Sequence, residues 1–509
     1  MHSEGISWHT TLHDQPFPEL LGLGCQAATS ADGQWIAVSS VTHQQSRVAV
    51  YRVADLSCAH LLTFTMESES MAFHPTLPLL AIALDNGEEY GREGGLTLLE
   101  ADTGHRADFT DPAWGIEPVR WLDDRTLELT FFALEHGEDS LMARATVVRE
   151  NWLGLAPDAL DLTSLDRTPH DPEDPGTYDD VPPALPLLHA LAERAGRRYD
   201  ARGGVRAVAG LGDGRVLATR KHVAVECWAA DGSALWSVPA PSARPGTRIE
   251  VAADERTVRV AVAGPDRRAR TDFLLVDTDD GTVLDQHAVP FSAAMSARTD
   301  GVWAIRDTYD RDSGTEPPNT PHTPNTRIFA ADGSPIGSVH VPDRYDLVPL
   351  DARRCPELLY VRRGRRGRRD VVALAPDGGA ESVLFTVDAP LGRAVYASDG
   401  AGPALFHGRT ELVRRVFPSG EVLWSRPLES EVLDLDTHAG VLYALCADGS
   451  LVRVDAADGS VLHRHPLPPY GPLSLHAAPD GTVLVGTAAG QILRRPATRV
   501  PDGSESESE

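Results

Sequence analysis

Residues 415–428 read RVFPSGEVLWSRPL, and residues 453–467 read RVDAADGSVLHRHPL. A third segment, residues 227–239, reads CWAADGSALWSVP and aligns with the other two over its turn. Each segment has two runs of alternating apolar residues on either side of a glycine-containing turn, which is typical of a β-hairpin. The recurrence of one hairpin along the chain predicts a repeat protein built from strands.

The spacing of the turns predicts the type of repeat. From Gly232 onward the turn glycines stand at 232, 281, 333, 378, 420 and 459, a step of about 40–50 residues, which is the length of one four-stranded propeller blade. A second series of ten hairpins alternates with these turns, at residues 28–39, 71–84, 119–129, 205–219, 249–262, 294–305, 347–361, 394–406, 432–445 and 473–486. We therefore expect an all-β fold, a β-propeller of four-stranded antiparallel blades with seven to ten repeats.

The ends of the chain predict how the ring closes. The last repeat, residues 472–496, supplies about three strands, and residues 6–12, from Ile6 to Leu12, alternate as a half-buried strand does. We expect this segment to be the missing strand of the last blade, so that residues 1–496 form the propeller; a frayed N-terminal arm is the alternative. Residues 497–509 are acidic and serine-rich and should be disordered.

Ten hairpins exceed the usual number of blades, which is four to eight. Three arrangements are open. The ring is unusually large, or one or two hairpins are decorations, or residues 204–496 form a seven-bladed ring and the first three units pack elsewhere.

Two segments interrupt the repeat. Residues 156–204 form an insertion that begins with an acidic, proline-containing loop at 158–180 and continues as LPLLHALAERAGRRY, where apolar residues recur at helical spacing. We expect one helix at 185–198, either lying on the propeller rim or serving as a docking helix for another protein. Residues 306–327 contain several prolines and little apolar surface, and they lengthen one hairpin as a loop.

Composition narrows the class of protein. The 509 residues include 74 acidic and 47 basic ones, a net charge of −27 that opposes binding to nucleic acid or to an anionic membrane. We find no apolar run of membrane-spanning length, no secretory signal and no Cys-x-x-Cys pair among the five cysteines. A cytoplasmic protein is expected. Lys221 is the only lysine, which is typical of GC-rich bacterial coding.

The strongest local charge feature is VRRGRRGRRD at a predicted hairpin tip. Forked guanidinium donors fit phosphate or carboxylate, and glycines let a ligand approach the backbone. Three interpretations of the run are open. It binds nucleic-acid phosphate, it binds an acidic protein, or it pairs with the protein's own acidic insertion. The candidate partner-binding residues are Arg362, Arg363, Arg365, Arg366, Arg368 and Arg369.

Metal and enzyme signatures are weak. His9 and His13 share a face only on a helix, and His463 and His465 share a strand face without a third ligand. The aspartates of VDTDDGT at 276–282 lack the glutamate that closes a calcium loop. No Gly-x-Ser-x-Gly, Gly-x-x-x-x-Gly-Lys or His-Glu-x-x-His motif occurs. We predict no catalytic, metal or cofactor-binding residue from these patterns.

The repeats resemble two known groups. The segments ADGSALW, PSGEVLW and DAADGSVLH are similar to repeats of pyrroloquinoline-quinone (PQQ)-type propellers, and SADGQWIAVSS and FHPTLPLLAIAL in the N-terminal part resemble WD40 repeats. The chain departs from both: it has no Trp-Asp dipeptide, and His463 stands where Trp236 and Trp424 stand in the sister repeats. The resemblance implies a bacterial β-propeller and specifies blades, not an activity.

Two functions follow as hypotheses. The first is a non-catalytic protein-interaction scaffold; by analogy with propellers of bacterial three-gene systems, its partners would be a MoxR-type ATPase or a von Willebrand A-type protein. The alternative is a propeller enzyme of the hydrolase or lactonase type with a carboxylate and histidine site at the central channel. Convergence of Asp, Glu or His from several blades on that channel would favour the enzyme.

Overall fold

The computed structural model describes residues 10–12, 16–20, 26–42, 45–86, 93–134, 140–169, 184–197, 199, 203–241, 246–263, 270–289, 293–307, 326–339, 347–350, 352–363, 368–375, 382–399 and 402–495. This part of the chain holds ten antiparallel sheets, nine of four strands and one with a short fifth strand that pairs in parallel. The predicted all-β class is confirmed, and each of the ten predicted hairpins is a pair of antiparallel strands.

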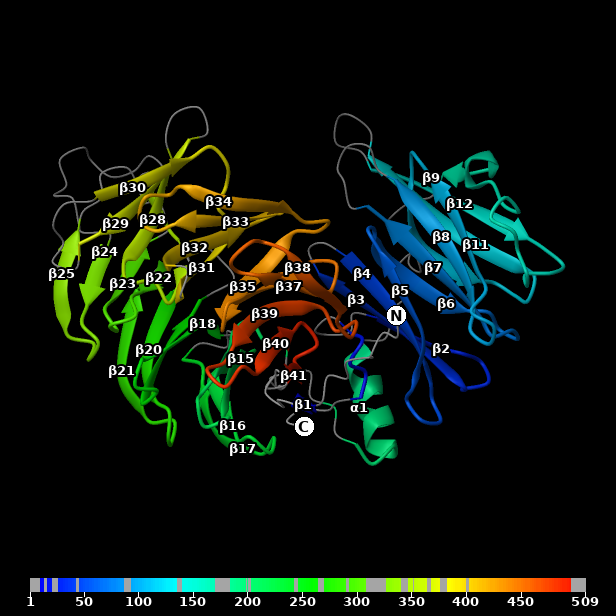
Figure 1. The fold of residues 1–509 in the computed structure, drawn as a ribbon. Helices are drawn as coiled ribbons and strands as arrows, with labels where there is room; N and C mark the ends of the chain where they lie inside the picture. The colour runs from blue at the N-terminus through cyan, green and yellow to red at the C-terminus, as the bar shows by residue number, and fades with distance from the viewer. Residues whose placement is uncertain are drawn as a thin grey trace, which may run out of the picture. The chain divides into compact units, whose positions relative to one another are not determined.

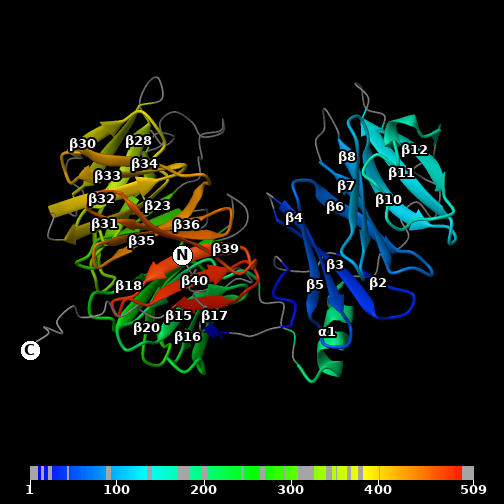
Figure 2. The same cartoon turned by 45° about the vertical axis from the view of Figure 1, so that its right-hand side comes forward.

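The chain divides into two compact units, residues 14–203 and residues 204–509 together with 1–13. The first unit holds three sheets, and the second holds seven (Figures 1 and 2). Seven sheets within residues 204–496 correspond to one of the three arrangements that the sequence leaves open.

The three sheets of the first unit follow one another along the chain. Their strands are β2 (Gln26–Thr29), β3 (Trp35–Thr42), β4 (Gln45–Arg52) and β5 (Cys58–Phe64); β6 (Glu67–Phe73), β7 (Leu79–Asp85), β8 (Gly94–Glu100) and β9 (Arg106–Asp111); and β10 (Gly115–Trp121), β11 (Thr126–Leu134), β12 (Ser140–Val148) and β13 (Thr168–Pro169). A short 3₁₀ helix, Leu162–Ser164, precedes β13.

The helix α1 (Ala184–Arg194) belongs to the first unit and is shorter than predicted. Its apolar face, with Leu188 and Leu191, packs in one buried cluster with Phe17, Leu20 and Tyr51 beside the β2–β5 sheet. The amphipathic pattern of the sequence is therefore used within the unit.

The seven sheets of the second unit begin with β14 (Val208–Gly210), β15 (Val216–Arg220), β16 (Val223–Trp228) and β17 (Ala234–Pro239), followed by β18 (Gly246–Val251), β19 (Thr257–Val262), β20 (Thr271–Asp277) and β21 (Val283–Val289). The third and fourth sheets are β22 (Ala293–Ala297), β23 (Trp303–Asp307), β24 (Thr326–Phe329) and β25 (Pro335–Val339), and β26 (Leu347–Pro349), β28 (Leu358–Arg363), β29 (Arg369–Leu374) and β30 (Ser382–Val387).

The remaining sheets are β31 (Arg393–Asp399), β32 (Gly402–Gly408), β33 (Glu411–Val416) and β34 (Val422–Pro427), with β27 (Ala352–Arg353) as a fifth strand; β35 (Val432–His438), β36 (Val441–Cys446), β37 (Ser450–Asp455) and β38 (Val461–Pro466); and β39 (Pro472–Ala477), β40 (Val483–Thr487), β41 (Ile492–Arg495) and β1 (Thr10–Leu12). β1 pairs antiparallel with β41, so the N-terminal segment supplies the outer strand of the last sheet. Ile6 and Trp8 lie outside the described residues.

Every sheet of the second unit shares a buried apolar cluster with the next one. The last cluster joins Leu12 and Leu484 of the last sheet to Val208 and Val216 of the first. Because both faces of each blade are apolar, only a closed array can cover all of them. The second unit is therefore a closed seven-bladed ring.

Tryptophans of two outer strands explain the glycine turns. The Trp236 Nε1–H donates to the Thr278 carbonyl at 3.1 Å, and a Cβ atom at Gly281 would lie 2.8 Å from the Trp236 ring. Trp424 likewise covers Gly459 of the next sheet. The glycines serve both the left-handed turn and the close approach of the neighbouring blade.

Candidate functional site

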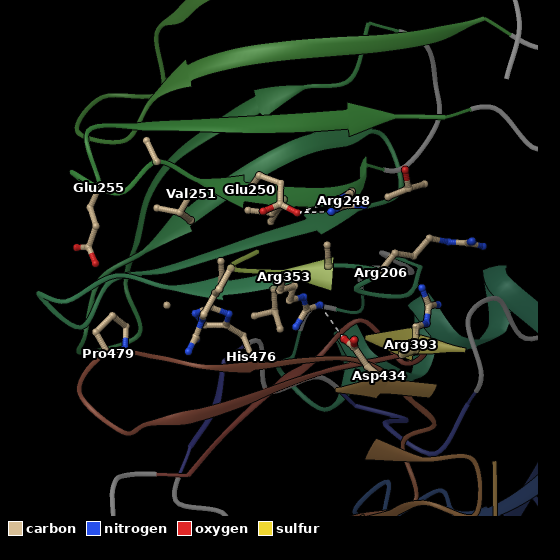
Figure 3. A pocket seen from close by; sticks show the side chains of 18 of the residues that line it. Arg206, Arg248, Glu250, Val251, Glu255, Arg353, Arg393, Asp434, His476 and Pro479 are labelled. Atoms are coloured by element: carbon tan, nitrogen blue, oxygen red, sulfur yellow. Dashed lines mark hydrogen bonds and ion pairs between the residues drawn. The ribbon is translucent and has the colours of Figure 1, made fainter. Parts of the chain in front are cut away.

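A cavity of about 450 Å³ opens at the centre of the seven-bladed ring (Figure 3). Its wall is made by inner strands of several sheets, including β14, β18, β35 and β39, and by β27. Its charged side chains are Arg206, Arg248, Glu250, Glu255, Arg353, Arg354, Arg393 and Asp434, with His476 beside them. Inner strands line the channel of a propeller because each blade starts at the axis.

Two consecutive arginines enter the cavity from β27. This strand leaves the β26 sheet and pairs in parallel with β31 of the next sheet, Arg353 opposite Val395. Arg354 follows with a φ of 61°, in the left-handed region that L-residues rarely adopt. This turn lets Arg353 and Arg354 both reach the inner strands β35 and β39.

The contacts of Arg353 and Arg354 hold them in place. Arg353 Nη2 donates to Asp434 Oδ2 at 2.9 Å, and its Nη1 donates to the Leu475 carbonyl. Arg354 donates to the carbonyls of Thr437 and Ala477 at 2.5 and 2.7 Å, and it forms an ion pair with Asp436 at 3.3 Å. Guanidinium groups held by several acceptors lose little freedom when a ligand binds.

Asp434 and Asp436 join two neighbouring blades. Asp434 accepts from the amides of Leu435 and Leu475, at 2.9 and 2.7 Å. Asp436 accepts in the same way from Thr437 and Ala477, at 2.8 and 2.7 Å. Each carboxylate therefore bridges β35 and β39 by main-chain hydrogen bonds.

Asp436 is a fixed anion at neutral pH. Its complete burial alone would raise its pKa, but the Arg354 guanidinium, the hydrogen bond and charge of His476, and Arg353 outweigh burial and hold the pKa well below its ordinary value. Such a carboxylate does not exchange protons near pH 7 and acts by orienting its neighbours.

His476 carries the only imidazole that lines the cavity in the described part of the chain, and its Nδ1 lies 3.2 Å from Asp436 Oδ2. An Nδ1–H that donates to the carboxylate fixes the orientation of the ring at the cavity wall. Figure 3 shows His476 among the lining side chains, below Glu250.

The remaining wall is cationic. Arg248 donates to Glu250 Oε1 at 2.6 Å (Figure 3). It also donates to the Met295 carbonyl at 2.6 Å. Arg206 is exposed, and its guanidinium has no hydrogen-bond or ion-pair partner among the described residues. Five guanidinium groups face three carboxylates, so the cavity wall is net positive in a protein of net charge −27. This arrangement suits an anionic group.

The arginine run that the sequence singled out lies elsewhere. Its first arginines end β28 and its last one begins β29, two strands that pair with Arg362 opposite Asp370. Arg362 also forms an ion pair with Asp370 at 3.6 Å, and Arg368 is exposed. Arg365 and Arg366 lie outside the described residues, as does part of the acidic segment 158–180. Of the described side chains of this run, Arg362, Arg368 and Arg369 do not line the central cavity.

The aspartates at 277–280, which the sequence offered only as a weak resemblance to a calcium loop, have a local explanation. Asp277 and Asp280 accept hydrogen bonds from the amides of Asp279 and Thr282 in their own turn, each at 2.8 Å. In the described part of the chain no group of three or more His, Cys, Asp or Glu side chains is placed to hold a metal ion. His9 and His13 lie outside the described residues. No helix found there is long and apolar enough to cross a membrane.

The cavity residues were not found by sequence analysis. The signal that could have found them is the LDLDT stretch of β35, where two aspartates alternate with leucines. Alternation alone places such aspartates on a solvent face. Only the neighbouring strand β39 shows that they are buried.

Comparison with known proteins gives one match to a family model. Residues 367–505, from β29 to beyond β41, match the model described as outer membrane protein assembly factor BamB, of the PQQ type. Among curated proteins none matches the chain.

Several solved structures are similar at 13% sequence identity. A chain of the mitotic checkpoint complex has a TM-score of 0.44, with 58% of this chain and 90% of that chain covered. The designed Ika8 protein has a TM-score of 0.40 and coverage of 75% and 96%. The WD40 β-propeller domain of Doa1 has a TM-score of 0.41 and coverage of 57% and 92%.

The sheet topology establishes the fold independently of these likenesses, and the family match shows the type of repeat in the last blades. The chain is a β-propeller protein with PQQ-type repeats in its C-terminal part.

Proposed function

We propose that this protein is a non-enzymatic interaction platform, and that the central cavity of its seven-bladed ring receives a short acidic segment of a partner protein. The observation that carries the proposal is the net positive wall, in which Arg353 and Arg354 are held by two carboxylates that are themselves fixed by main-chain amides. Preorganised guanidinium groups favour carboxylate ligands.

The charge of the whole chain restricts the ligand. A field from a net charge of −27 repels long polyanions such as nucleic acid. A short acidic segment reaches the local positive charge of the cavity and leaves the rest of its chain on the ring surface. A protein partner therefore fits better than a nucleic acid.

The test measures binding of fluorescein-labelled hexaglutamate to the full-length protein, with hexalysine as the opposite probe. We expect the acidic peptide alone to bind, and Arg206→Gln to weaken binding by about tenfold, because a charge-assisted hydrogen bond is lost. Arg409→Gln is the matched control, since Arg409 is an exposed arginine paired with Glu431 outside the cavity. Equal binding by both variants, or equal binding of both peptides, contradicts the proposal.

The identity of the partner is a further part of the proposal. The analogy with bacterial three-gene systems makes a cytoplasmic MoxR-type ATPase or a von Willebrand A-type protein the first candidate. Affinity purification of the parent protein and of the Arg206→Gln variant from the native host would compare the proteins that each retains. A partner lost only from the variant would be the one that uses the cavity.

A second function is favoured by one observation. Glu250, Asp434 and His476 line the channel from three different sheets, and the buried Asp436 lies 3.2 Å from His476. In a hydrolase of the lactonase type, His476 would act as general base, oriented by Asp436, and the arginines would hold an anionic substrate. Hydrolysis of a carboxylate-bearing lactone that disappears in His476→Gln and persists in Arg409→Gln would establish this function in place of the first.

A further inference from the structure

The strand order gives the seven-bladed ring two distinct ends. The first six blades each contribute four antiparallel strands to their sheet in chain order, and an even number of strands returns the chain to the end where it entered the blade. The connections between blades have three to seven residues, so every inner strand begins at the same end of the ring. We call this end the entry end. The turns that follow the inner strands lie at the opposite end.

The central cavity has a cationic mouth at the entry end. Arg206 stands two residues before β14, and Arg393 is the first residue of β31. Both side chains are exposed, and both line the cavity. The opposite mouth is lined by Glu255 and Pro479, in the turns that follow β18 and β39. Figure 3 shows the two pairs of residues on opposite sides of the cavity.

The opposite end of the ring is acidic. The turns between the third and fourth strands of a blade also lie there, and four of them, at 229–233, 278–282, 330–334 and 456–460, contain no basic residue. Their exposed aspartates are Asp231, Asp279, Asp280, Asp332 and Asp458. An acidic ligand is repelled from this end, so it reaches the cavity from the entry end.

The arginine hairpin lies at the entry end as well. Leu347, the first residue of the inner strand β26, is the register partner of Arg362 near the end of β28. The connection from β28 to β29 therefore stands at the same end of the ring as Arg206 and Arg393. Two cationic features that are far apart in the sequence thus belong to one face of the ring.

The hairpin is close to the wall of the cavity. Neighbouring strands of a sheet lie about 4.8 Å apart, so β28 and β29 stand about 5 and 10 Å outward from the inner strand of their blade. An extended peptide of eight residues spans up to about 26 Å. A linker of that length is enough for one peptide to occupy the mouth and to reach the hairpin, where Arg368 is exposed.

We propose that the cationic mouth and the arginine hairpin form one docking face for a partner segment with two acidic blocks. One block enters the cavity beside Arg206 and Arg393, and the other lies on Arg362, Arg368 and Arg369. This inference rests on the proposed function, because the first block occupies the same cavity. Guanidinium groups suit carboxylates, and two weak contacts on one peptide bind more tightly than either alone because the second contact is intramolecular.

The test compares two fluorescein-labelled peptides of equal length on the full-length protein. The two-block peptide carries two hexaglutamate blocks joined by an eight-residue Gly-Ser linker, and in the one-block peptide the second block is hexaserine. We expect the two-block peptide to bind about tenfold more tightly or better. Joint replacement of Arg362, Arg368 and Arg369 by glutamine should abolish this gain, and Arg368→Gln alone should reduce it. Arg256→Gln, at an exposed arginine in the turn after β18, is the matched control at the opposite end and should keep the gain.

The outcomes separate this inference from the proposed function. If hexaglutamate does not bind, or binds Arg206→Gln as it binds the parent, the cavity receives no acidic segment and both proposals fall. If hexaglutamate binds through Arg206 but the two-block peptide gains nothing, or keeps its gain in both hairpin variants, only the shared docking face is overturned.

Two further results would also overturn the shared face. Equal loss of the gain in Arg256→Gln and Arg368→Gln would show an effect of general charge. Tighter binding of a twenty-nucleotide oligothymidylate than of the two-block peptide, lost in the hairpin variants, would assign the face to nucleic acid instead. Circular dichroism and melting curves check that each variant is folded.

Discussion

Arg353 Nη2 lies 2.9 Å from Asp434 Oδ2, although the two residues are 81 positions apart and stand on strands of different sheets. Asp434 is at the same time hydrogen-bonded to the Leu475 amide of a third sheet. One ion pair thus connects three consecutive blades at the axis of the ring. This connection and the neighbouring Arg354–Asp436 pair hold Arg353 and Arg354 at the central cavity.

Asp436→Asn should destabilise the ring strongly. The substitution removes a buried charge that faces Arg354 and His476, and it weakens the bridge to β39. Breaking a buried ion pair on one side costs about 3–5 kcal/mol of the free energy of unfolding. Urea unfolding measures the loss. Asp458→Asn, at an exposed turn, is the control and should cost no more than about 1 kcal/mol of the free energy of unfolding. Equal losses for the two variants would contradict a special contribution of Asp436 to the stability of the ring.

The contribution of Asp436 should also depend on pH. Its folded-state pKa is depressed below the ordinary 3.8, so the unfolded chain binds the proton first as the pH falls. The stabilisation is complete above the unfolded pKa and is lost progressively as the pH falls from there toward the folded pKa. The difference in unfolding free energy between the parent and Asp436→Asn should be constant from pH 7 down to the ordinary pKa of 3.8 and should shrink as the pH falls further, in measurements extended to about pH 2. A difference that stays constant below pH 3.8 would contradict this linkage.

Gly459→Ala should be more damaging than Gly440→Ala. Both glycines have positive φ, 74° and 75°. A Cβ atom at Gly459 would lie 2.7 Å from the Trp424 ring, whereas none of the described atoms lies within 4 Å of one at Gly440. Gly440→Ala should therefore lower the free energy of unfolding by about 1–2 kcal/mol, the cost of placing an L-residue in the left-handed region alone. The excess loss for Gly459→Ala, measured by thermal unfolding, reports the blade contact, and no excess would mean that Trp424 moves aside freely.

The N-terminal strand should be needed for stability. Leu12 is buried in the cluster that joins the last sheet to the first. Leu12→Ala should cost about 2–5 kcal/mol, and deletion of residues 1–13 should expose the β41 edge and cause aggregation. Light scattering and melting curves test both. Deletion of 497–509 is the matched terminal control. An unchanged melting temperature after deletion of 1–13 would contradict the role of this segment as the closing strand.

The arginine hairpin makes a separate prediction. Replacing Arg362, Arg363, Arg365, Arg366, Arg368 and Arg369 with serine should leave the fold intact and weaken partner capture, because a hairpin tip contributes little to the core. If the run instead pairs with residues 158–180, their deletion should strengthen heparin binding and steepen its salt dependence. If the parent, the serine variant and the deletion variant all bind heparin equally weakly, the arginine run is only a solvated turn.

Local pattern was sufficient for the blades. Alternating apolar residues and Asp-Gly or Ser-Gly turns act within about 15 residues, so the hairpins at 415–428 and 453–467 could be recognised directly. The closing strand was also predictable, since Leu12 alternates with the polar residues around it.

The sites depended on contacts between blades. The aspartates of β35 look like solvent-facing residues in one dimension, and they are buried because β39 and β27 of neighbouring sheets cover them. Strand periodicity is a property of one segment. The charge and the hydrogen bonds of a side chain depend instead on which other segments surround it, and in this protein the closed ring decides which segments those are.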